Sequence, residues 1–484
     1  MRAAAWLRAP NGLPHGSRRA WPSPPADRWT LAAVCGLVAA ASLAAAVLHL
    51  VGRPVHAPAA PLFARFAPHL GPGTPLAAGL AVAVVRWGPG LAGRLRWPRL
   101  LYLAWVASVA WTFSLALVDG WQRGVAGRLT TRFEYLSEVP GVTDVPAMLR
   151  GFTGRIVDGT ADPWTTHVAG HPPGALLVFV GLDRLGLSGG GWAAVVCVLA
   201  GCLATVAVAV TLRALGDEAA ARAAVPFLVL FPGAVWVGVS ADGLFTGVAA
   251  VATALLAVGL TRPSRWAVVG GGAGLAGCAY LSYGLVLLAL PALAVVVGAR
   301  SSRSRAALCG QLGWAVLGAA IVAGGFSLLG FDWWGGYQAV QQRYYQGVAA
   351  ERPYAYWIWA NLAALALSAG PAAAVMLRHA VTTVWSARPP GLHRLPRPPG
   401  PRLLSRPALV RHPPAVVMCL AAAAAVIAAD LSGLSKAEVE RIWLPFAIWF
   451  PAAAVLLPAP DRRGWLCFQA GTALLVNHVV LTVW

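Results

Sequence analysis

Long apolar stretches recur along almost the whole chain, and this feature restricts the possible folds more than any other. A helix that crosses a bilayer core needs roughly 17–25 predominantly apolar residues. Thirteen stretches approach or reach that length, at residues 30–51, 72–87, 99–118, 190–212, 221–238, 243–260, 266–280, 281–299, 306–330, 356–377, 414–431, 442–458 and 464–483. The sequence therefore predicts an all-α, polytopic membrane protein with about 13 transmembrane helices.

The composition excludes a water-soluble protein, because 58% of the 484 residues are hydrophobic and only 11% are charged. A net charge of +20 would fit a nucleic-acid partner, but the basic residues lie in short segments between apolar runs, as in cytoplasmic loops. We therefore expect no nucleic-acid partner. The seven cysteines show no metal-ligand spacing. Lys436 is the only lysine among 37 basic residues, which indicates a GC-rich genome and favours a bacterial plasma membrane.

The distribution of charge predicts which loops face the cytoplasm. If the apolar segment 172–187 does not cross the membrane, 25 of the 37 basic residues lie in inner loops and 13 of the 17 acidic residues in outer ones. We therefore interpret this segment as a helix on the outer face, with the amino terminus inside and the carboxyl terminus outside. The predicted parts are a basic terminus (1–29), amino-terminal transmembrane helices (30–118), a large extracytoplasmic loop (119–189), and a bundle (190–484) containing a cytoplasmic Pro/Arg-rich loop (379–413).

The large outer loop carries seven carboxylates, of which Glu134, Glu138 and Asp144 are candidate catalytic groups. Glu134 and Glu138 are four residues apart, so on a helix they would share a face. A carboxylate that is partly desolvated at a membrane surface, near an arginine such as Arg132, suits a general base towards an acceptor hydroxyl. The alternative for each of these acids is an ordinary solvated loop charge.

His167 and His171 also lie in this loop, and their spacing would suit a metal if they shared a helix. Pro172 and Pro173 would break such a helix, however, and favour the start of a new one. We therefore expect no metal at this pair of histidines. His171 then becomes a candidate for binding a phosphate or the acceptor, with His167 beside it.

Later outer segments add four candidate substrate-binding residues. Asp242 lies next to an apolar run, where an ionisable residue is costly and suggests function; the alternative is a helix N-cap. Lys436, Glu440 and Arg441 precede another run. The guanidinium of Arg441 suits two phosphate oxygens, and its alternative is an interfacial anchor.

An aromatic stretch from Trp333 to Tyr345 also lies in an outer segment. It fits an interfacial belt or, alternatively, a surface that stacks on a sugar or lipid head group.

Three short motifs resemble those of the GT-C superfamily of membrane glycosyltransferases, especially the protein O-mannosyltransferase and aminoarabinose-transferase branch and uncharacterised actinobacterial relatives. Arg132-Phe-Glu134-Tyr is similar to the acidic motif of the first loop, His171-Pro-Pro-Gly to a Pro-Pro-Leu segment, and Arg441-Ile-Trp-Leu-Pro445 to an Arg-Tyr-x-x-Pro segment. The chain departs from the pattern in having two extra spans before the loop. It also has a single glutamate, Glu134, where the family usually has a pair of acids.

The resemblance implies an inverting transfer of a sugar from a polyprenyl-phosphate donor to a glycan, lipid or protein acceptor at the extracytoplasmic face. It implies that a carboxylate such as Glu134 deprotonates the acceptor and that basic groups such as Arg441 and Lys436 hold the departing phosphate, with His171 and Asp242 as supports. Membrane lipid is a further expected partner. The resemblance also implies no cofactor, because the phosphate leaves as a stable anion bound by cations. The alternatives are a polytopic transporter or lipid flippase, and a non-catalytic scaffold of envelope assembly.

Overall fold

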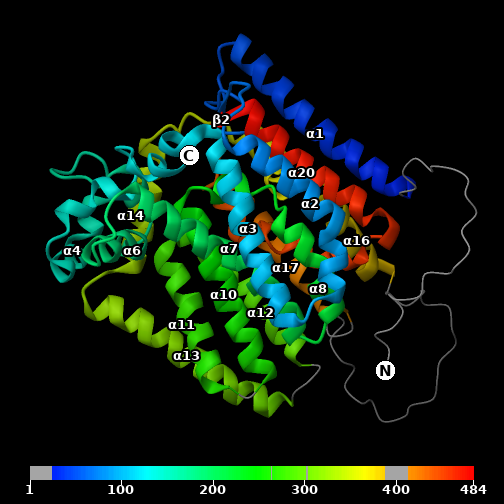
Figure 1. Cartoon of the computed structure of the whole chain (residues 1–484). Helices are drawn as coiled ribbons and strands as arrows, with labels where there is room; N and C mark the ends of the chain where they lie inside the picture. Colours follow the sequence, from blue (N-terminus) through cyan, green and yellow to red (C-terminus); the bar gives the residue numbers. More distant parts are fainter. Residues whose placement is uncertain (1–23, 263, 301–303, 387–411, 484) are drawn as a thin grey trace, which may run out of the picture.

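The computed structural model describes residues 24–262, 264–300, 304–386 and 412–483, and these residues form a bundle of helices (Figure 1). Seven of the helices in this part of the chain are long and apolar enough to cross a membrane. They are α1 (Pro25–Leu50), α2 (Gly73–Arg94), α3 (Trp97–Ala116), α7 (Gly190–Ala214), α10 (Ala241–Thr261), α13 (Arg305–Leu328) and α17 (Pro414–Leu431). Within the described ranges, the only sheet pairs β1 (Ala64–Phe66) with β2 (Val480–Thr482). The prediction of an all-α, polytopic membrane protein is confirmed.

Several predicted spans are interrupted, so the count of 13 is not confirmed. The stretch 356–377 forms α15 (Tyr354–Ala369) and α16 (Pro371–Ser386), which are bent by 107° at Gly370. Other stretches break into shorter pieces: α8 (Glu218–Val229) with α9 (Ala234–Val237), η7 (Tyr283–Leu288) with α12 (Ala289–Ala299), and α18 (Val439–Ile442) with α19 (Leu444–Ala447) and η9 (Phe450–Leu456). Apolar composition predicts that a segment is buried, but proline and glycine decide whether its helix is continuous.

Four helices pack side by side in the order α7, α10, α11 (Arg265–Leu281) and α13. α10 packs between α7 and α11, and α11 packs between α10 and α13. α11 and α13 approach closely because both carry glycine at the contact: a Cβ on Gly272 would meet the carbonyl oxygen of Ala315, and one on Gly318 that of Val269. Small residues permit this kind of close helix crossing in membranes, where packing rather than the hydrophobic effect holds helices together.

We expect Gly318→Leu to push α13 away from α11, because its side chain would collide with backbone. Overpacking of this kind costs roughly 1–3 kcal/mol or more, so the temperature of unfolding in detergent, followed by tryptophan fluorescence, should fall clearly. Gly313→Leu on the same helix is the matched control, because a Cβ there has nothing within 4 Å. Equal unfolding temperatures for the two variants would contradict this account of the helix contact.

The large outer loop folds into short helical turns at one end of the bundle. Its 3₁₀ and π turns are η1 (Leu117–Asp119), η2 (Gln122–Ala126), η3 (Arg128–Thr130), η4 (Tyr135–Ser137), η5 (Val139–Gly141) and η6 (Thr153–Arg155), and its α-helices are α4 (Val145–Gly151), α5 (Thr166–Ala169) and α6 (Pro173–Arg184). α6 has 12 residues, too few to cross a membrane, and it begins at the predicted proline pair. α14 (Trp333–Gln346) lies beside α4 and α6 (Figure 1).

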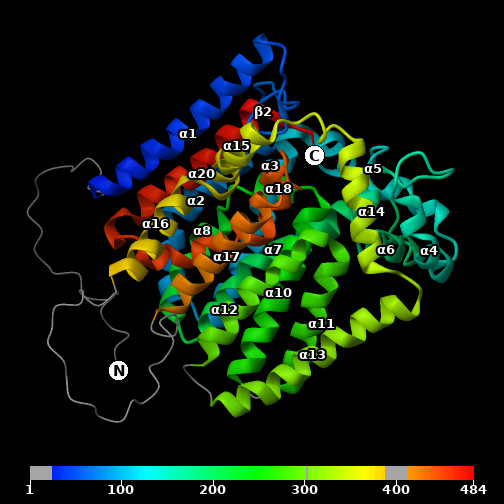
Figure 2. The ribbon, with the colours of Figure 1, turned by 180° about the vertical axis from the view of Figure 1, so that it is seen from behind.

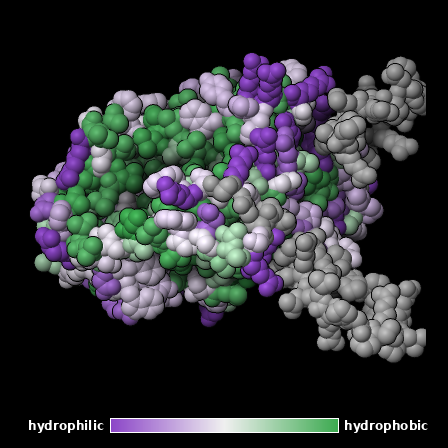
Figure 3. All heavy atoms as spheres, turned by 90° about the horizontal axis from the view of Figure 1, so that it is seen from below, coloured by the Kyte–Doolittle hydropathy of each residue, from purple (hydrophilic) through white to green (hydrophobic). Residues whose placement is uncertain are grey.

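Several contacts between distant segments join parts of the chain that the charge distribution assigns to the same side. On the predicted inner side, Arg222 Nη1 donates to the carbonyl oxygens of Ala92 (2.7 Å) and Leu95 (3.1 Å), and Asp27 pairs with Arg378. α1 runs along α15 and α16 (Figure 2). Seen from below, apolar side chains cover much of the molecule, and hydrophilic ones gather on part of this face (Figure 3).

On the predicted outer side, His69 Nε2 lies 2.8 Å from Asp119 Oδ1, and Arg128 Nη2 lies 2.9 Å from Asp119 Oδ2. Thr74 Oγ1 lies 2.9 Å from Nε2 of His478, near the end of α20 (Arg462–Val479), which follows η10 (Ala459–Asp461). These contacts tie the segment before α2 to the large loop, and α2 to α20. Which end faces the cytoplasm stays a prediction.

Two predicted segments fall largely outside the described residues: the basic terminus 1–29, of which residues 1–23 are not described, and the Pro/Arg-rich loop, of which 387–411 are not described. Residues 379–386, which were assigned to that loop, are helical because α16 continues to Ser386.

Candidate active site

Asp242 lies in the first turn of α10 and faces Arg441, which is 199 residues away in the sequence. Arg441 Nη1 is 2.7 Å from Asp242 Oδ2, and both residues are buried, with exposed fractions of 6% and 4%. The N-cap of α10 is Ser240, whose hydroxyl accepts a hydrogen bond from the Gly243 N–H at 3.1 Å. The alternative that Asp242 caps the helix is therefore wrong.

A second carboxylate and a second guanidinium extend this ion pair. Arg441 Nη2 donates to Glu438 at 2.9 Å, and both terminal nitrogens of Arg352 donate to the other oxygen of Glu438, at 3.1 and 3.2 Å. Charges thus alternate along Asp242, Arg441, Glu438 and Arg352. Because Arg441 is buried between carboxylates, the alternative of an anchor that reaches out to solvent is also wrong.

The electrostatics of this group follow from its burial and its alternating charges. Burial alone would lower the pKa of Arg441, but the Asp242 and Glu438 carboxylates raise it above its ordinary value. Burial alone would raise the pKa of Glu438, but Arg441 and Arg352 lower it. Glu438 and Arg441, which lie outside the membrane-spanning helices, therefore stay charged at neutral pH.

The segment that carries Glu438 is held in a strained conformation. Ala437 and Glu438 both have positive φ angles, 68° and 63°, which cost non-glycine residues about 1–2 kcal/mol each. Asn361 holds the segment in place: its amide donates to Ser435 O at 2.7 Å and to Asp430 Oδ1 at 2.8 Å, and its oxygen accepts from the Ala437 N–H at 3.3 Å. Strain of this kind concentrates at functional sites.

Glu134 is the carboxylate of the large loop that lies at this group. Its side chain is buried, and Oε1 is 3.5 Å from His167 Nε2. Burial raises the pKa of Glu134 to about 7, with Arg441 lowering it and Asp242 raising it further. The fold therefore brings Glu134 within electrostatic range of Asp242 and Arg441 and leaves it able to exchange a proton near neutral pH.

The two histidines form part of the wall beside Glu134. Burial lowers the pKa of His171 and, by more, that of His167, so both rings are neutral at pH 7. His171 Nδ1 is 2.8 Å from the carbonyl oxygen of His167; a carbonyl only accepts, so Nδ1 carries the proton and Nε2 is an acceptor. Among the described residues, no three His, Cys, Asp or Glu side chains are grouped to hold a metal ion.

The other two candidate bases have structural contacts. Glu134 and Glu138 do not share the face of one helix, because η4 and η5 are successive 3₁₀ turns with Pro140 in the second. Glu138 accepts a hydrogen bond from the Thr165 N–H at 2.9 Å. Asp144 caps α4 by accepting from the Ala147 N–H at 3.1 Å. These contacts leave Glu134 as the carboxylate of the three that the fold brings to Arg441.

Lys436 lies at the edge of the group, with an exposed fraction of 7%. Its ammonium is 5.9 Å from the ring centre of Tyr344 and 5.3 Å from that of Tyr345, both at the end of α14. The Lys436 N–H also donates to the Tyr344 hydroxyl at 2.9 Å. The aromatic stretch therefore divides: Tyr344 and Tyr345 contact the site, whereas Trp334, which is 61% exposed, lies on the surface.

Glu440 has a different neighbour from the other charged residues. Its Oε1 accepts a hydrogen bond from the Phe63 N–H at 2.8 Å, which ties the loop between α1 and α2 to α18. Burial raises the pKa of Glu440 to about 7. This geometry does not support the predicted contact of Glu440 with substrate. The hydrogen bond to Phe63 instead suits a residue that positions the segment carrying Arg441.

We expect Glu440→Gln to make stability less dependent on pH. The carboxyl has a pKa of about 7 when folded and an ordinary value of 4.5, so the folded protein binds the extra proton and stability is lost as pH rises from about 5 to 8. The variant should match wild type at pH 5 and exceed it by on the order of 1–3 kcal/mol at pH 8, as measured by thermal unfolding. Glu351→Gln is the control, because its side chain is 68% exposed and lies 3.3 Å from His56 Nε2. An exposed ion pair contributes little, so this variant should change the difference in stability between pH 5 and pH 8 by less than Glu440→Gln does.

Sequence analysis found Glu134, Asp242 and Arg441 but missed Arg352 and the role of Glu438. Glu438 lies in the same short segment as Arg441, between Lys436 and Glu440. The spacing of these charged residues does not show which of them form ion pairs. Arg352 lies in a turn that the charge distribution predicts to be outside, and only the tertiary fold shows that it reaches Glu438.

No protein-family model matches the chain, and no curated protein matches it in sequence. Solved structures with a similar chain path include ArnT from Cupriavidus metallidurans, bound to undecaprenyl phosphate (TM-score 0.44) and in the apo state (0.42); both are 16% identical, and each match covers 72% of this chain and 59% of ArnT. The oligosaccharyltransferase of Archaeoglobus fulgidus, in complex with Zn and sulfate, has a TM-score of 0.39 and 16% identity, over 78% of this chain and 50% of that one. The chain thus spans less than two thirds of each matched structure. Similarity this low assigns no role to any residue here.

Proposed function

We propose that this protein is a membrane glycosyltransferase that moves a sugar from a polyprenyl-phosphate donor to an acceptor hydroxyl at the extracytoplasmic face. The observation that carries the proposal is that Glu134, a buried carboxyl group with a pKa of about 7, lies within electrostatic range of the linked ion pairs of Asp242, Arg441 and Glu438. The motif resemblance to GT-C enzymes supports the same reaction.

In the proposed reaction, one base removes the acceptor proton and several cations stabilise the departing phosphate. Glu134 takes the proton of the acceptor hydroxyl as its oxygen forms a bond to the anomeric carbon of the sugar. The bond from that carbon to the phosphate oxygen breaks on the opposite side, which inverts the configuration. The electron pair leaves with the polyprenyl phosphate, whose added negative charge is stabilised by nearby cations.

Lys436 is the cation best placed to bind the phosphate. Among the residues that the structure describes, no carboxylate forms an ion pair with its ammonium, which faces the rings of Tyr344 and Tyr345. Arg441 and Arg352 are already bound to carboxylates. We therefore assign phosphate binding to Lys436, and to the two arginines the positive field and the positions of Asp242 and Glu438.

The test is to incubate the purified protein with labelled polyprenyl-phosphate mannose, arabinose or glucose, and to measure release of polyprenyl phosphate together with labelled product. Wild type should consume at least one donor and leave nucleotide sugars untouched. In proteoliposomes, movement of an intact donor between leaflets with no product would instead support the transporter reading, and would overturn the proposal.

A further inference from the structure

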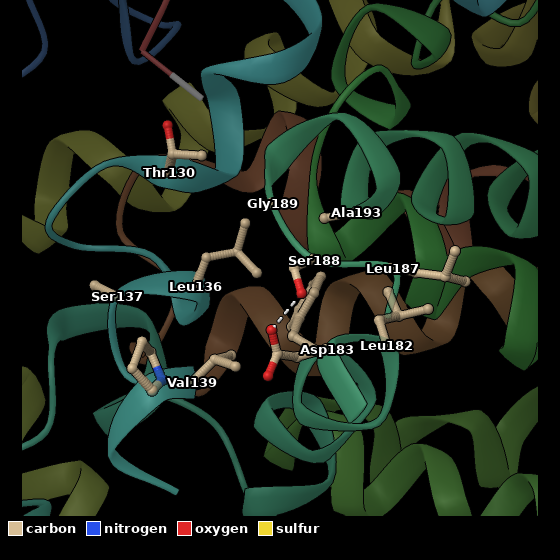
Figure 4. A pocket seen from close by; sticks show the side chains of 12 residues that line it. Thr130, Leu136, Ser137, Val139, Leu182, Asp183, Leu187, Ser188, Gly189 and Ala193 are labelled. Carbon is tan, nitrogen blue, oxygen red and sulfur yellow. Dashed lines mark hydrogen bonds between the residues drawn. The ribbon is translucent and has the colours of Figure 1, made fainter. Parts of the chain in front are cut away.

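A cavity of about 300 Å³ lies between turns η3 to η5, α6 and the start of α7 (Figure 4). Its walls are mainly apolar, with Leu136, Val139, Phe179, Leu182 and Leu187 among them. Its volume is at the lower end of the range for small-molecule sites. It is separate from the ion pairs of the candidate active site, since none of the paired residues lines it.

The polar groups of this cavity define what it could bind. Asp183 is the only charged side chain among the described residues that line it, and the Ser188 hydroxyl donates to Asp183 Oδ1 at 2.6 Å (Figure 4). Ser137 and Thr130 add hydroxyls at other points of the wall. A carboxylate with no cation beside it in the cavity disfavours a phosphate and favours an uncharged group whose hydroxyls donate hydrogen bonds.

A groove of about 190 Å³ lies farther along the same side of α7. We call it the lower groove, and the cavity at Asp183 the upper cavity. The lower groove is formed by α7, α10 and α11, and its lining is entirely apolar, with Ala200, Leu203, Gly247 and Gly270 among its residues. Ala193 of the upper cavity and Ala200 are seven residues apart. They therefore lie on one face of α7, about 10 Å apart along its axis.

Exposed tryptophans indicate the level of the upper cavity relative to a membrane. Trp192, next to Ala193, is 50% exposed, and Trp121, whose ring lies near Gly191, is 52% exposed. Tryptophan favours the boundary between lipid tails and head groups. The upper, partly polar cavity then lies at this boundary, and the lower, apolar groove lies within the hydrocarbon.

The upper cavity also borders the site of Glu134. Ser137, which lines the cavity, donates its hydroxyl to the carbonyl oxygen of Glu134 at 2.6 Å. Tyr135 stacks on Phe179 of the cavity wall, with 5.2 Å between ring centres. Cys197, one helical turn beyond Ala193, is within electrostatic range of Glu134. A molecule in the cavity would therefore lie against the turn that carries the candidate base.

From these observations we infer that the cavity and the groove together bind one neutral, hydroxyl-bearing lipid, with its head at Asp183 and Ser188 and its tail along α7. That this lipid is the acceptor of sugar transfer rests on the proposed function. That it binds at this site does not, because the site is inferred from its shape and charge alone. The absence of basic residues from the cavity lining separates this lipid from the phosphate-bearing donor, which would use Lys436.

The test measures equilibrium binding of labelled monoglucosyl diacylglycerol to the protein in phosphatidylcholine nanodiscs, with undecaprenyl phosphate as a competitor. Ala193→Phe fills the upper cavity, and Gly270→Leu fills the lower groove, where an added Cβ meets only Leu255 Cδ1 at 3.5 Å. Each should weaken glycolipid binding by about tenfold or more and leave binding of undecaprenyl phosphate unchanged. Gly310→Leu on α13 is the control, because a Cβ there has nothing within 4 Å.

Asp183→Asn supplies a second test that keeps the volume of the cavity. It should weaken binding of the glycolipid severalfold and leave binding of triacylglycerol, which has no hydroxyl to donate, unchanged. Wild-type affinity in both Ala193→Phe and Gly270→Leu, or displacement of the glycolipid by undecaprenyl phosphate, would overturn the inference. Normal glycolipid binding by a protein that transfers no sugar would instead refute the proposed function and leave the binding site standing.

Discussion

Glu134→Gln should lower the rate of sugar transfer by about 10²–10⁴-fold, the usual contribution of a general base. The amide has nearly the same shape as the carboxyl group but cannot take the acceptor proton. The fold should tolerate it, because the change removes an ionisable group from a buried position. Single-turnover transfer measures the rate, thermal unfolding reports the fold, and binding of undecaprenyl phosphate shows that the donor site is intact.

The pH dependence of wild type provides a second readout of the same residue. The base must be ionised to act, and the pKa of Glu134 is about 7. The rate should therefore rise about tenfold per pH unit below pH 7 and level off above it, and Glu134→Gln should lose this rise.

Glu138→Gln is the matched control for this experiment, because its amide oxygen can still accept the hydrogen bond from the Thr165 N–H. It should keep most of the wild-type rate. If Glu134→Gln transferred sugar as fast as Glu138→Gln, the base would have to be another group, with Asp242 the next carboxylate to test.

Sequence analysis predicted the class of the fold because bilayer thickness fixes the length of an apolar run. It could not predict which runs form one straight helix. The stretch 356–377 reads as one span, but Gly370, with φ of 86°, and Pro371 turn the chain by 107°. The stretch 442–458 is similar: Pro445 and Pro451 lie within short helical turns. Hydropathy measures transfer into lipid, whereas continuity depends on backbone conformation and on which helices satisfy the broken hydrogen bonds.

Only part of the candidate site could be predicted, because the sequence does not show which distant residues come into contact in the fold. Asp242 and Arg441 were recognisable because charges beside apolar runs are costly. Sequence spacing could not show that they form one ion pair. Nor could it show that Glu138 and Asp144 have local structural roles while Glu134 lies within electrostatic range of the pair. The partners of Arg441 also include Glu438, whose left-handed backbone conformation is set by Asn361 on α15.

Arg441→Met should destabilise the protein by about 3–5 kcal/mol, which is the typical cost of removing one partner from buried ion pairs. Its guanidinium bonds both Asp242 and Glu438, and the variant leaves those carboxylates with fewer cations at a buried site. Arg441→Lys should recover only part of the loss, because an ammonium lacks the planar fork that reaches two carboxylates at once. Thermal and chemical unfolding of the purified variants measures the effect.

The same prediction separates the structural role of Arg441 from the phosphate-binding role assigned to Lys436. Adding Asp242→Asn to Arg441→Met should restore some stability, with a coupling energy of about 0.5–3 kcal/mol, because the unpaired charge is removed. Lys436→Met should change stability little, since its ammonium pairs with no carboxylate among the described residues, and should weaken binding of undecaprenyl phosphate by about 10–100-fold. If Lys436→Met bound that lipid as wild type does while Arg441→Lys did not, the two roles would have to be exchanged: Arg441 would hold the phosphate, and the carboxylates beside it would be partners that the donor displaces.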